Sequence, residues 1–151
     1  MNASNDCLAD TNVLVYAHDP RDHTKQRRAI DVLDRLIRNQ RAVLSAQCLS
    51  EYFVTVTRRL PEPLTLLDAT VQVERLLRSC RVLDVTPGIV LEACRATIQH
   101  GLSYWDALIW AAARLNQIPY ILTEDAPHGR FLEGVRYLNP FVPEFDDRLL
   151  T

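Results

Sequence analysis

Four acidic side chains, spread along the chain, have the residue type and the setting to hold a divalent metal ion: Asp10, Glu51, Asp106 and Asp125. Asp10 directly follows the apolar run Cys7-Leu8-Ala9, and Asp125 lies three residues after an apolar run that ends at Leu122. Carboxylate oxygens are hard ligands that select Mg²⁺, with Mn²⁺ as a substitute. A metal ion that keeps some of its waters can activate one of them for attack on a phosphodiester.

The elements expected around these acids form an α/β domain. Apolar runs predict strands over residues 6–10, 42–44, 81–84 and 118–122, and a weaker run predicts a fifth over 135–138. Helical spacing and capping residues predict helices over 12–17, 23–39, 46–60, 65–79, 87–99 and 104–116. Strands that alternate with helices pair in parallel and carry helices on both faces. We therefore expect a single three-layer α/β/α domain over residues 1–151, with a central, mainly parallel sheet of four to five strands.

This arrangement brings the four acids to one rim of the sheet. Asp10 and Asp125 follow strands, and Glu51 and Asp106 lie in the first turns of helices that begin at the same edge. Ligands bind in open parallel sheets beyond the carboxyl ends of the strands. Two carboxylates ~5 Å apart repel each other by roughly 3 kcal/mol at an effective dielectric constant near 20. A divalent cation at the centre would remove this repulsion, and protonation of some of the acids is the alternative.

Each acid also has a purely structural interpretation. Asp10 can cap the helix that follows it, and Asp106 can complete a Ser-x-x-Asp cap with Ser103. Glu51 can be a solvated helix residue, and Asp125 can be a turn residue. The placement of all four at one sheet edge is what favours the metal site.

The composition bounds the class of protein. The chain has 151 residues, a formal net charge of −2 and 48% hydrophobic residues, which are typical of a globular protein. No apolar stretch approaches the ~20 residues of a membrane span, and residues 1–6 show no secretory signal. The cysteines form no C-x-x-C pair, so we expect buried, reduced thiols and a cytoplasmic protein.

Four stretches resemble the PIN-domain ribonucleases, and most closely the VapC-type toxins of bacterial toxin–antitoxin pairs. The matching stretches, in order, are 8–14 (Leu-Ala-Asp-Thr-Asn-Val-Leu), 44–52 (Leu-Ser-Ala-Gln-Cys-Leu-Ser-Glu-Tyr), 102–109 (Leu-Ser-Tyr-Trp-Asp-Ala-Leu-Ile) and 120–125 (Tyr-Ile-Leu-Thr-Glu-Asp). The resemblance spans residues 8 to 138, and its order and spacing are specific. Residues 126–129 follow the family pattern only loosely.

The resemblance implies a PIN-like nuclease domain in which the four acids form the metal site, with Asp10 and Asp106 as the most direct ligands. Glu51 and Asp125 would bind a second ion or orient the attacking water, and Asn12 and Thr123 match supporting polar residues. It implies endonucleolytic cleavage of RNA that leaves a 5′-phosphate and a 3′-hydroxyl. It also implies a homodimer that is silenced by a cognate VapB-type antitoxin.

Two other classes of function remain open at this point. A receiver domain or a haloacid-dehalogenase-type phosphatase also uses a strand-end aspartate with Mg²⁺. Both, however, need a lysine late in the chain, and the only lysine here is Lys25; the phosphatase pattern also needs Asp where this chain has Asn12. A PIN-fold module that binds RNA or protein without catalysis is the main alternative.

Two surfaces are expected to serve binding. The arginines that could hold RNA phosphates around the acids, rather than being simply solvated, are Arg27, Arg28, Arg58, Arg59, Arg130 and Arg136. The helix over 65–79 carries more apolar residues than one buried stripe needs. It is expected either to form a dimer or antitoxin interface or to pack into the core.

Overall fold

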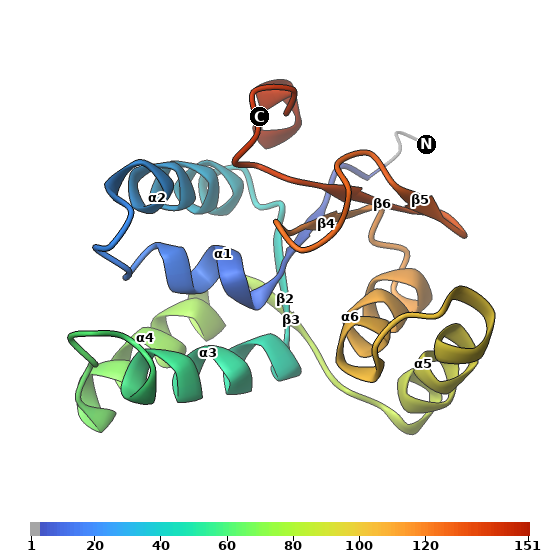
Figure 1. The fold of residues 1–151 in the computed structure, drawn as a ribbon, viewed down its shortest axis with the longest axis horizontal. Coiled ribbons are helices and arrows are strands. Elements are labelled where there is room, and N and C mark those ends of the chain that lie inside the picture. Colours follow the sequence, from blue (N-terminus) through green and yellow to red (C-terminus); the bar gives the residue numbers. More distant parts are fainter. Residues whose placement is uncertain (1–3) are drawn as a thin grey trace.

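The computed structural model describes residues 4–151, in which each of the first three strands is followed by two helices and the last three strands follow one another (Figure 1). The strands are β1 (Cys7–Ala9), β2 (Ala42–Ser45), β3 (Arg81–Leu83), β4 (Tyr120–Leu122), β5 (Phe131–Leu132) and β6 (Val135–Leu138). The helices are α1 (Thr11–Tyr16), α2 (His23–Arg38), α3 (Ala46–Arg58), α4 (Leu66–Ser79), α5 (Pro87–His100), α6 (Tyr104–Leu115) and the short 3₁₀ helix η1 (Asp147–Leu150). Residues 1–3, part of the segment in which no secretory signal was expected, lie outside the described residues.

The sheet has the order β3-β2-β1-β4-β6-β5, and every pairing is parallel except that of β5 with β6. The chain first builds the sheet outward from β1 to β3 and then returns to place β4 on the other side of β1. Figure 1 shows the consequence: α1 to α4 lie on one side of the sheet, and α5 and α6 lie on the other. The predicted three-layer α/β fold is confirmed, and the strand order reverses between β1 and β4.

Hydroxyl caps start four of the helices where the sequence predicts them. Ser45, Thr65, Thr86 and Ser103 each accept a hydrogen bond from a backbone N–H in the first turn of the helix that follows. Helix α5 ends at Gly101, whose φ of 65° lies in the left-handed region that glycine adopts without strain. The helix boundaries expected from these residues agree with the structure to within one or two residues.

A sixth strand, β5, was not predicted. Its two residues pair with β6 across a two-residue turn, Glu133-Gly134, in which both residues have positive φ angles of 43° and 89°. Such a turn matches the twist of an antiparallel hairpin, so it folds the short strand back onto the sheet edge. The hairpin ends the sheet beside β6, and backbone hydrogen bonds join Tyr137 of β6 to Gly129 and Arg130 in the loop that follows β4.

The carboxyl-terminal segment packs against α2. Phe145 and Leu150 are buried, and the carboxylate of Asp147 accepts hydrogen bonds from Arg28 (2.7 Å) and Arg35 (3.0 Å). The side chain of Asn39 also donates to the backbone oxygen of Leu150 at 3.0 Å. The carboxyl-terminal segment is therefore docked against α2.

The cysteines differ in part from expectation. Cys7 and Cys48 are buried, and burial raises the pKa of each thiol to about 12. Cys80 is half-buried, but Cys94 is exposed on α5, next to the buried Ala93, so the expectation of four buried thiols is wrong at Cys94. None of the four is in a disulfide within residues 4–151. In the same range, no helix is both long and apolar enough to cross a membrane.

We expect the docked tail to stabilise the domain measurably. Leu150→Ala should lower the free energy of unfolding by about 2–5 kcal/mol, because Leu150 is fully buried against the core. Leu91→Ala, at an exposed position of α5, is the matched control and should change it by less than ~0.5 kcal/mol. Urea denaturation of both variants measures the difference, and equal stabilities would show that the tail does not anchor on α2.

Candidate functional site

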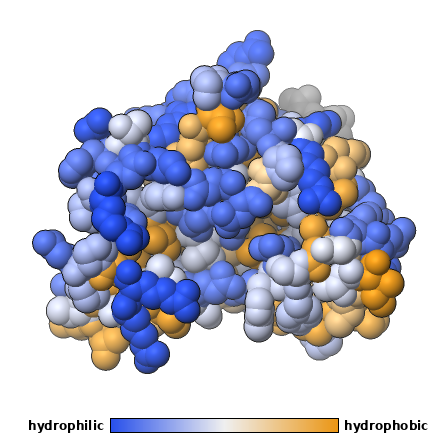
Figure 2. Space-filling view, viewed as in Figure 1, coloured by the Kyte–Doolittle hydropathy of each residue, from blue (hydrophilic) through white to orange (hydrophobic). Residues whose placement is uncertain are grey.

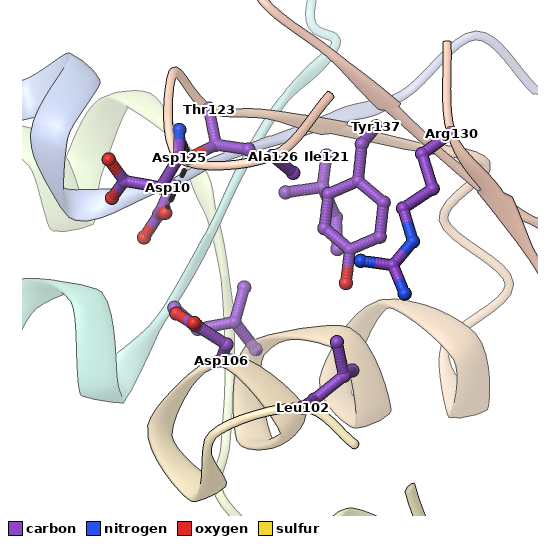
Figure 3. A pocket seen from close by; sticks show the side chains of 10 residues that line it. Asp10, Leu102, Asp106, Ile121, Thr123, Asp125, Ala126, Arg130 and Tyr137 are labelled. Atoms are coloured by element: carbon purple, nitrogen blue, oxygen red, sulfur yellow. Dashed lines mark hydrogen bonds between the residues drawn. The ribbon is translucent and has the colours of Figure 1, made fainter. Parts of the chain in front are cut away.

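The carboxylates of Asp10, Asp106 and Asp125 line one pocket of about 70 Å³ at the carboxyl edge of the sheet. Figure 3 shows Asp10 and Asp125 side by side on one wall, with Asp106 facing them from the start of α6. Asp10 follows β1 and Asp125 follows β4, so the pocket lies where the strand order reverses. This is the crevice in which open α/β sheets bind ligands.

Thr123 ties the two strand-end aspartates together. Its buried hydroxyl donates to Oδ2 of Asp10 (2.9 Å) and accepts hydrogen bonds from the side-chain amide of Asn12 (3.0 Å) and the backbone N–H of Asp125 (3.1 Å). The same amide of Asn12 donates to Oδ2 of Asp125 at 2.9 Å. Asn12 and Thr123 therefore orient the carboxylates of Asp10 and Asp125.

Glu51 lies beside this pocket and does not line it. Its two carboxylate oxygens accept hydrogen bonds from the hydroxyl of Thr11 and the side-chain amide of Gln47, each at 2.8 Å. Gln47 also donates to the backbone oxygen of Trp105, the residue before Asp106, at 3.1 Å. Sequence reasoning missed both Thr11 and Gln47; the spacing of Gln47 four residues before Glu51 on one helix was the signal for the second.

The structural interpretation of Asp10 as a helix cap is confirmed, and Ser103 caps α6, but no hydrogen bond from the N–H of Ser103 to the carboxylate of Asp106 is present among residues 4–151. The carboxylate of Asp10 caps α1 by accepting from the N–H of Thr11 at 2.7 Å, and Ser103 caps α6 by accepting from the N–H of Asp106 at 3.3 Å. An acid in the first turn of a helix is favoured by the helix dipole. Asp10 and Asp106 therefore lie at the starts of α1 and α6, and both helix starts face the acidic pocket.

Burial raises the pKa of Asp10 to about 6. The hydrogen bonds from Thr123 and Thr11 oppose this rise, whereas the charges of Asp125 and Asp106 add to it. Low solvation disfavours the ionised carboxylate, and a nearby cation would favour it. Burial therefore destabilises the ionised carboxylate of Asp10, and a bound metal ion would stabilise that ionised form.

The residues present fit a hydrated Mg²⁺ or Mn²⁺ ion. Oδ1 of Asn12 and Oε1 of Gln47 are buried oxygen atoms with no hydrogen-bond donor among residues 4–151, and both belong to the acidic cluster. Within that range, no three His, Cys, Asp or Glu side chains lie close enough together to hold one ion. Mg²⁺ in proteins is commonly bound by one or two carboxylates and several waters, and such waters donate to neighbouring acceptor oxygens. The orphaned acceptors match that mode of binding.

The arginines proposed to surround the acids fall into different settings. Arg130 lines the acidic pocket, and Arg59 lines a neighbouring hollow that also contains Asp125. Arg28 is committed to the docked tail, and Arg136 lies over the ring of Phe131 and donates to the backbone oxygen of Gly129. Arg27 and Arg58 are exposed on α2 and α3.

A PIN domain family model matches residues 7–131, so the chain belongs to the PIN domain family. The match covers every acid of the candidate site and the sheet up to the first residue of β5.

Solved structures share the fold at low sequence identity. A toxin–antitoxin complex from Klebsiella pneumoniae has a TM-score of 0.67 at 18% identity, covering 89% of this chain and 98% of that one. DNA-bound VapBC from Salmonella typhimurium has a TM-score of 0.63 at 16% identity, covering 89% and 98%. Mycobacterium tuberculosis VapC20, described as a toxin that cleaves the sarcin–ricin loop, has a TM-score of 0.58 at 20% identity, covering 77% and 87%. No curated protein sequence matches the chain.

The raised pKa of Asp10 makes a prediction about stability and pH. The folded state holds the proton of Asp10 up to about pH 6, whereas an ordinary carboxyl releases it near 3.8, so folding stability is lost as the pH rises between these values. Asp10→Asn cannot ionise. Relative to the wild type, its free energy of unfolding should increase by up to about 3 kcal/mol from pH 4 to pH 7.

Urea denaturation in EDTA across this pH range measures the effect. Asp84→Asn, which changes an exposed aspartate away from the pocket, is the matched control and should follow the wild-type curve. Parallel curves for Asp10→Asn and the wild type would mean that Asp10 titrates like a solvated carboxyl.

Proposed function

We propose that this chain is a metal-dependent endoribonuclease, a VapC-type toxin of a toxin–antitoxin pair. The observation that carries the proposal is the shared pocket of Asp10, Asp106 and Asp125, whose two strand-end members are oriented by Thr123 and Asn12. The PIN family and the fold of the toxin structures support it. Because the substrate is RNA, we propose the cytoplasm as the compartment.

In this proposal the carboxylates of Asp10 and Asp106 hold Mg²⁺, or Mn²⁺ in its place. When bound, the ion neutralises charge that develops on the phosphate and lowers the pKa of a water. Thr123 holds the Asp10 carboxylate in one orientation, and Asn12 holds that of Asp125. Asp125 would accept the proton of the attacking water or help to hold a second ion. Glu51 acts from beside the pocket, where Thr11 and Gln47 keep it in place to orient waters of the site.

The receiver or phosphatase alternative is disfavoured by the position of Lys25. Its ammonium group makes an ion pair with Glu124 at 2.8 Å and lies 4.9 Å from the centre of the Tyr16 ring. Lys25 does not line the acidic pocket, so it is not placed to pair with a phosphate there.

The direct test of the nuclease is RNA cleavage by purified protein. Wild type with millimolar Mg²⁺ should cleave RNA, EDTA should stop cleavage, and Asp10→Asn or Asp106→Asn should reduce the rate at least ~10²-fold, because each removes a metal-holding carboxylate. Asp68→Asn, in the first turn of α4, is a matched control for Asp106→Asn and should cleave normally. Wild-type cleavage rates in Asp10→Asn would refute the proposal.

A PIN-fold module that binds RNA or protein without catalysis is the competing reading. A metal ion that binds the native state must raise the melting temperature. Titration with Mn²⁺ should therefore raise the Tm of the wild type and not that of Asp10→Asn. No rise at millimolar Mn²⁺, together with absent cleavage, would favour the non-catalytic module.

The partners that we propose are an RNA substrate, a VapB-type antitoxin and a second copy of the chain. Helix α4 supports an interface, because Ala69 is its only fully buried residue and Leu66, Leu67, Val71 and Leu77 are exposed. Figure 2 shows apolar surface over the region of α4 at the lower left. The alternative of simple core packing does not account for these side chains.

Leu67→Glu should leave the protein folded and convert a dimer to a monomer if α4 forms the dimer interface. Leu91→Glu, on α5, is a matched control because Leu67 and Leu91 have the same exposed fraction, 73%. Sedimentation velocity measures the state of each variant. A folded Leu67→Glu variant that stays dimeric would exclude α4 from the dimer interface.

A further inference from the structure

The acidic pocket has a second end that the carboxylates do not occupy. Figure 3 shows Tyr137, from β6, and Arg130, from the loop before β5, on the side away from Asp10 and Asp125, with hydroxyl and guanidinium next to each other. Only 6% of Tyr137 is exposed. Its hydroxyl is buried and has no hydrogen-bond partner among residues 4–151.

The backbone fixes these two side chains relative to each other. The N–H of Tyr137 donates to the oxygen of Arg130 at 2.8 Å, and the N–H of Gly129 donates to the oxygen of Tyr137 at 2.7 Å. Gly129 has a φ of 89°, so the turn that begins at Pro127 depends on glycine here. The pair is therefore a preformed feature of the β4–β5 loop and β6.

The chemistry of the pair selects an anionic acceptor. Arg130 makes no ion pair within residues 4–151, whereas Arg28, Arg35, Arg95 and Arg114 all do. Burial raises the pKa of Tyr137, so its hydroxyl remains protonated and able to donate at neutral pH. Few buried hydroxyls in folded proteins lack a hydrogen-bond partner, so the hydroxyl of Tyr137 calls for an acceptor from outside residues 4–151. Two donors facing one space match the oxygens of a phosphate group.

We infer that Tyr137 and Arg130 form a phosphate-binding subsite, which holds a backbone phosphate of the bound RNA next to the one at the carboxylates. This inference rests on the proposed nuclease function. The hydroxyl and the guanidinium donate to non-bridging phosphate oxygens. The apolar side chains of Leu102 and Ala126, which line the same pocket, limit hydration and strengthen both hydrogen bonds.

Tyr137→Phe tests the subsite because it removes only the hydroxyl. The probe is uridine 3′,5′-bisphosphate with millimolar Mg²⁺, which carries two phosphates but no phosphodiester to cut. We expect the affinity to fall about tenfold, as for the loss of one hydrogen bond to a charged group. We expect an unchanged or higher Tm, because the hydroxyl has no partner to lose. Arg130→Ala should weaken binding too, and should reduce the salt dependence of binding to single-stranded RNA by about one phosphate contact.

Tyr52→Phe is the matched control. The hydroxyl of Tyr52 is hydrogen-bonded to Nε2 of His18 at 2.9 Å and lies outside the acidic pocket. This variant should lower the Tm and leave the affinity for the bisphosphate unchanged. The two tyrosine variants therefore separate a hydroxyl that binds a ligand from one that stabilises the fold.

Several results would overturn the subsite. The first is an affinity of Tyr137→Phe for the bisphosphate equal to that of the wild type, and the second is a loss of affinity accompanied by a fall in Tm as large as that of Tyr52→Phe. The third is that the wild type binds uridine without phosphates as well as the bisphosphate, and the fourth is that the wild type does not bind the bisphosphate. Failure here is distinct from failure of the nuclease. If Asp10→Asn abolishes RNA cleavage and Tyr137→Phe keeps the wild-type KM, only the subsite is wrong. If Asp10→Asn cleaves normally, the proposed function itself is wrong.

Discussion

The structure depends on holding like charges together at one edge of a sheet. Burial of Asp10 beside Asp106 and Asp125 opposes its ionisation, and the hydroxyl of Thr123 and the N–H of Thr11 compensate only in part. Burial therefore favours the neutral form of Asp10, and the cation that we propose at this site would favour the ionised form. The strand order brings Asp10 and Asp125 together, because β1 and β4 are adjacent strands at the point where the strand order reverses.

The polar groups around the acids both orient the carboxylates and connect the surrounding helices and strands. Hydrogen bonds from four polar side chains orient the carboxylates: those of Thr123, Asn12, Thr11 and Gln47. The same side chains connect the ends of β1 and β4 with α3 and the start of α6. A side chain whose rotamer is locked by such bonds needs little reorganisation when a ligand binds. The pocket continues past the acids to Arg130 and Tyr137, so one cavity combines an anionic end and a donor-rich end. A cavity with these two ends suits the phosphodiester backbone of the RNA substrate that we propose.

The helices on the two sides of the sheet differ in how far they are buried. Helix α6 is buried along most of its length and supports the floor of the pocket, whereas α4 exposes most of its apolar residues. The carboxyl-terminal segment covers α2 through Asp147 and Leu150 and leaves the acidic rim open. The face that holds the acids and the faces available to other chains are thus carried by different elements.

The sequence by itself determined the element order and the three layers, because apolar periodicity and hydroxyl caps are local properties, and it supplied the four candidate acids. It did not reveal β5, whose two residues are too short for periodicity and depend on the turn at Glu133-Gly134. Nor did it reveal that Glu51 stands beside the pocket, that Gln47 reaches Trp105, or that Tyr137 has a buried hydroxyl facing Arg130. Only the tertiary structure decided these points, because they are set by how side chains from distant elements pack, and burial is a property of the whole fold.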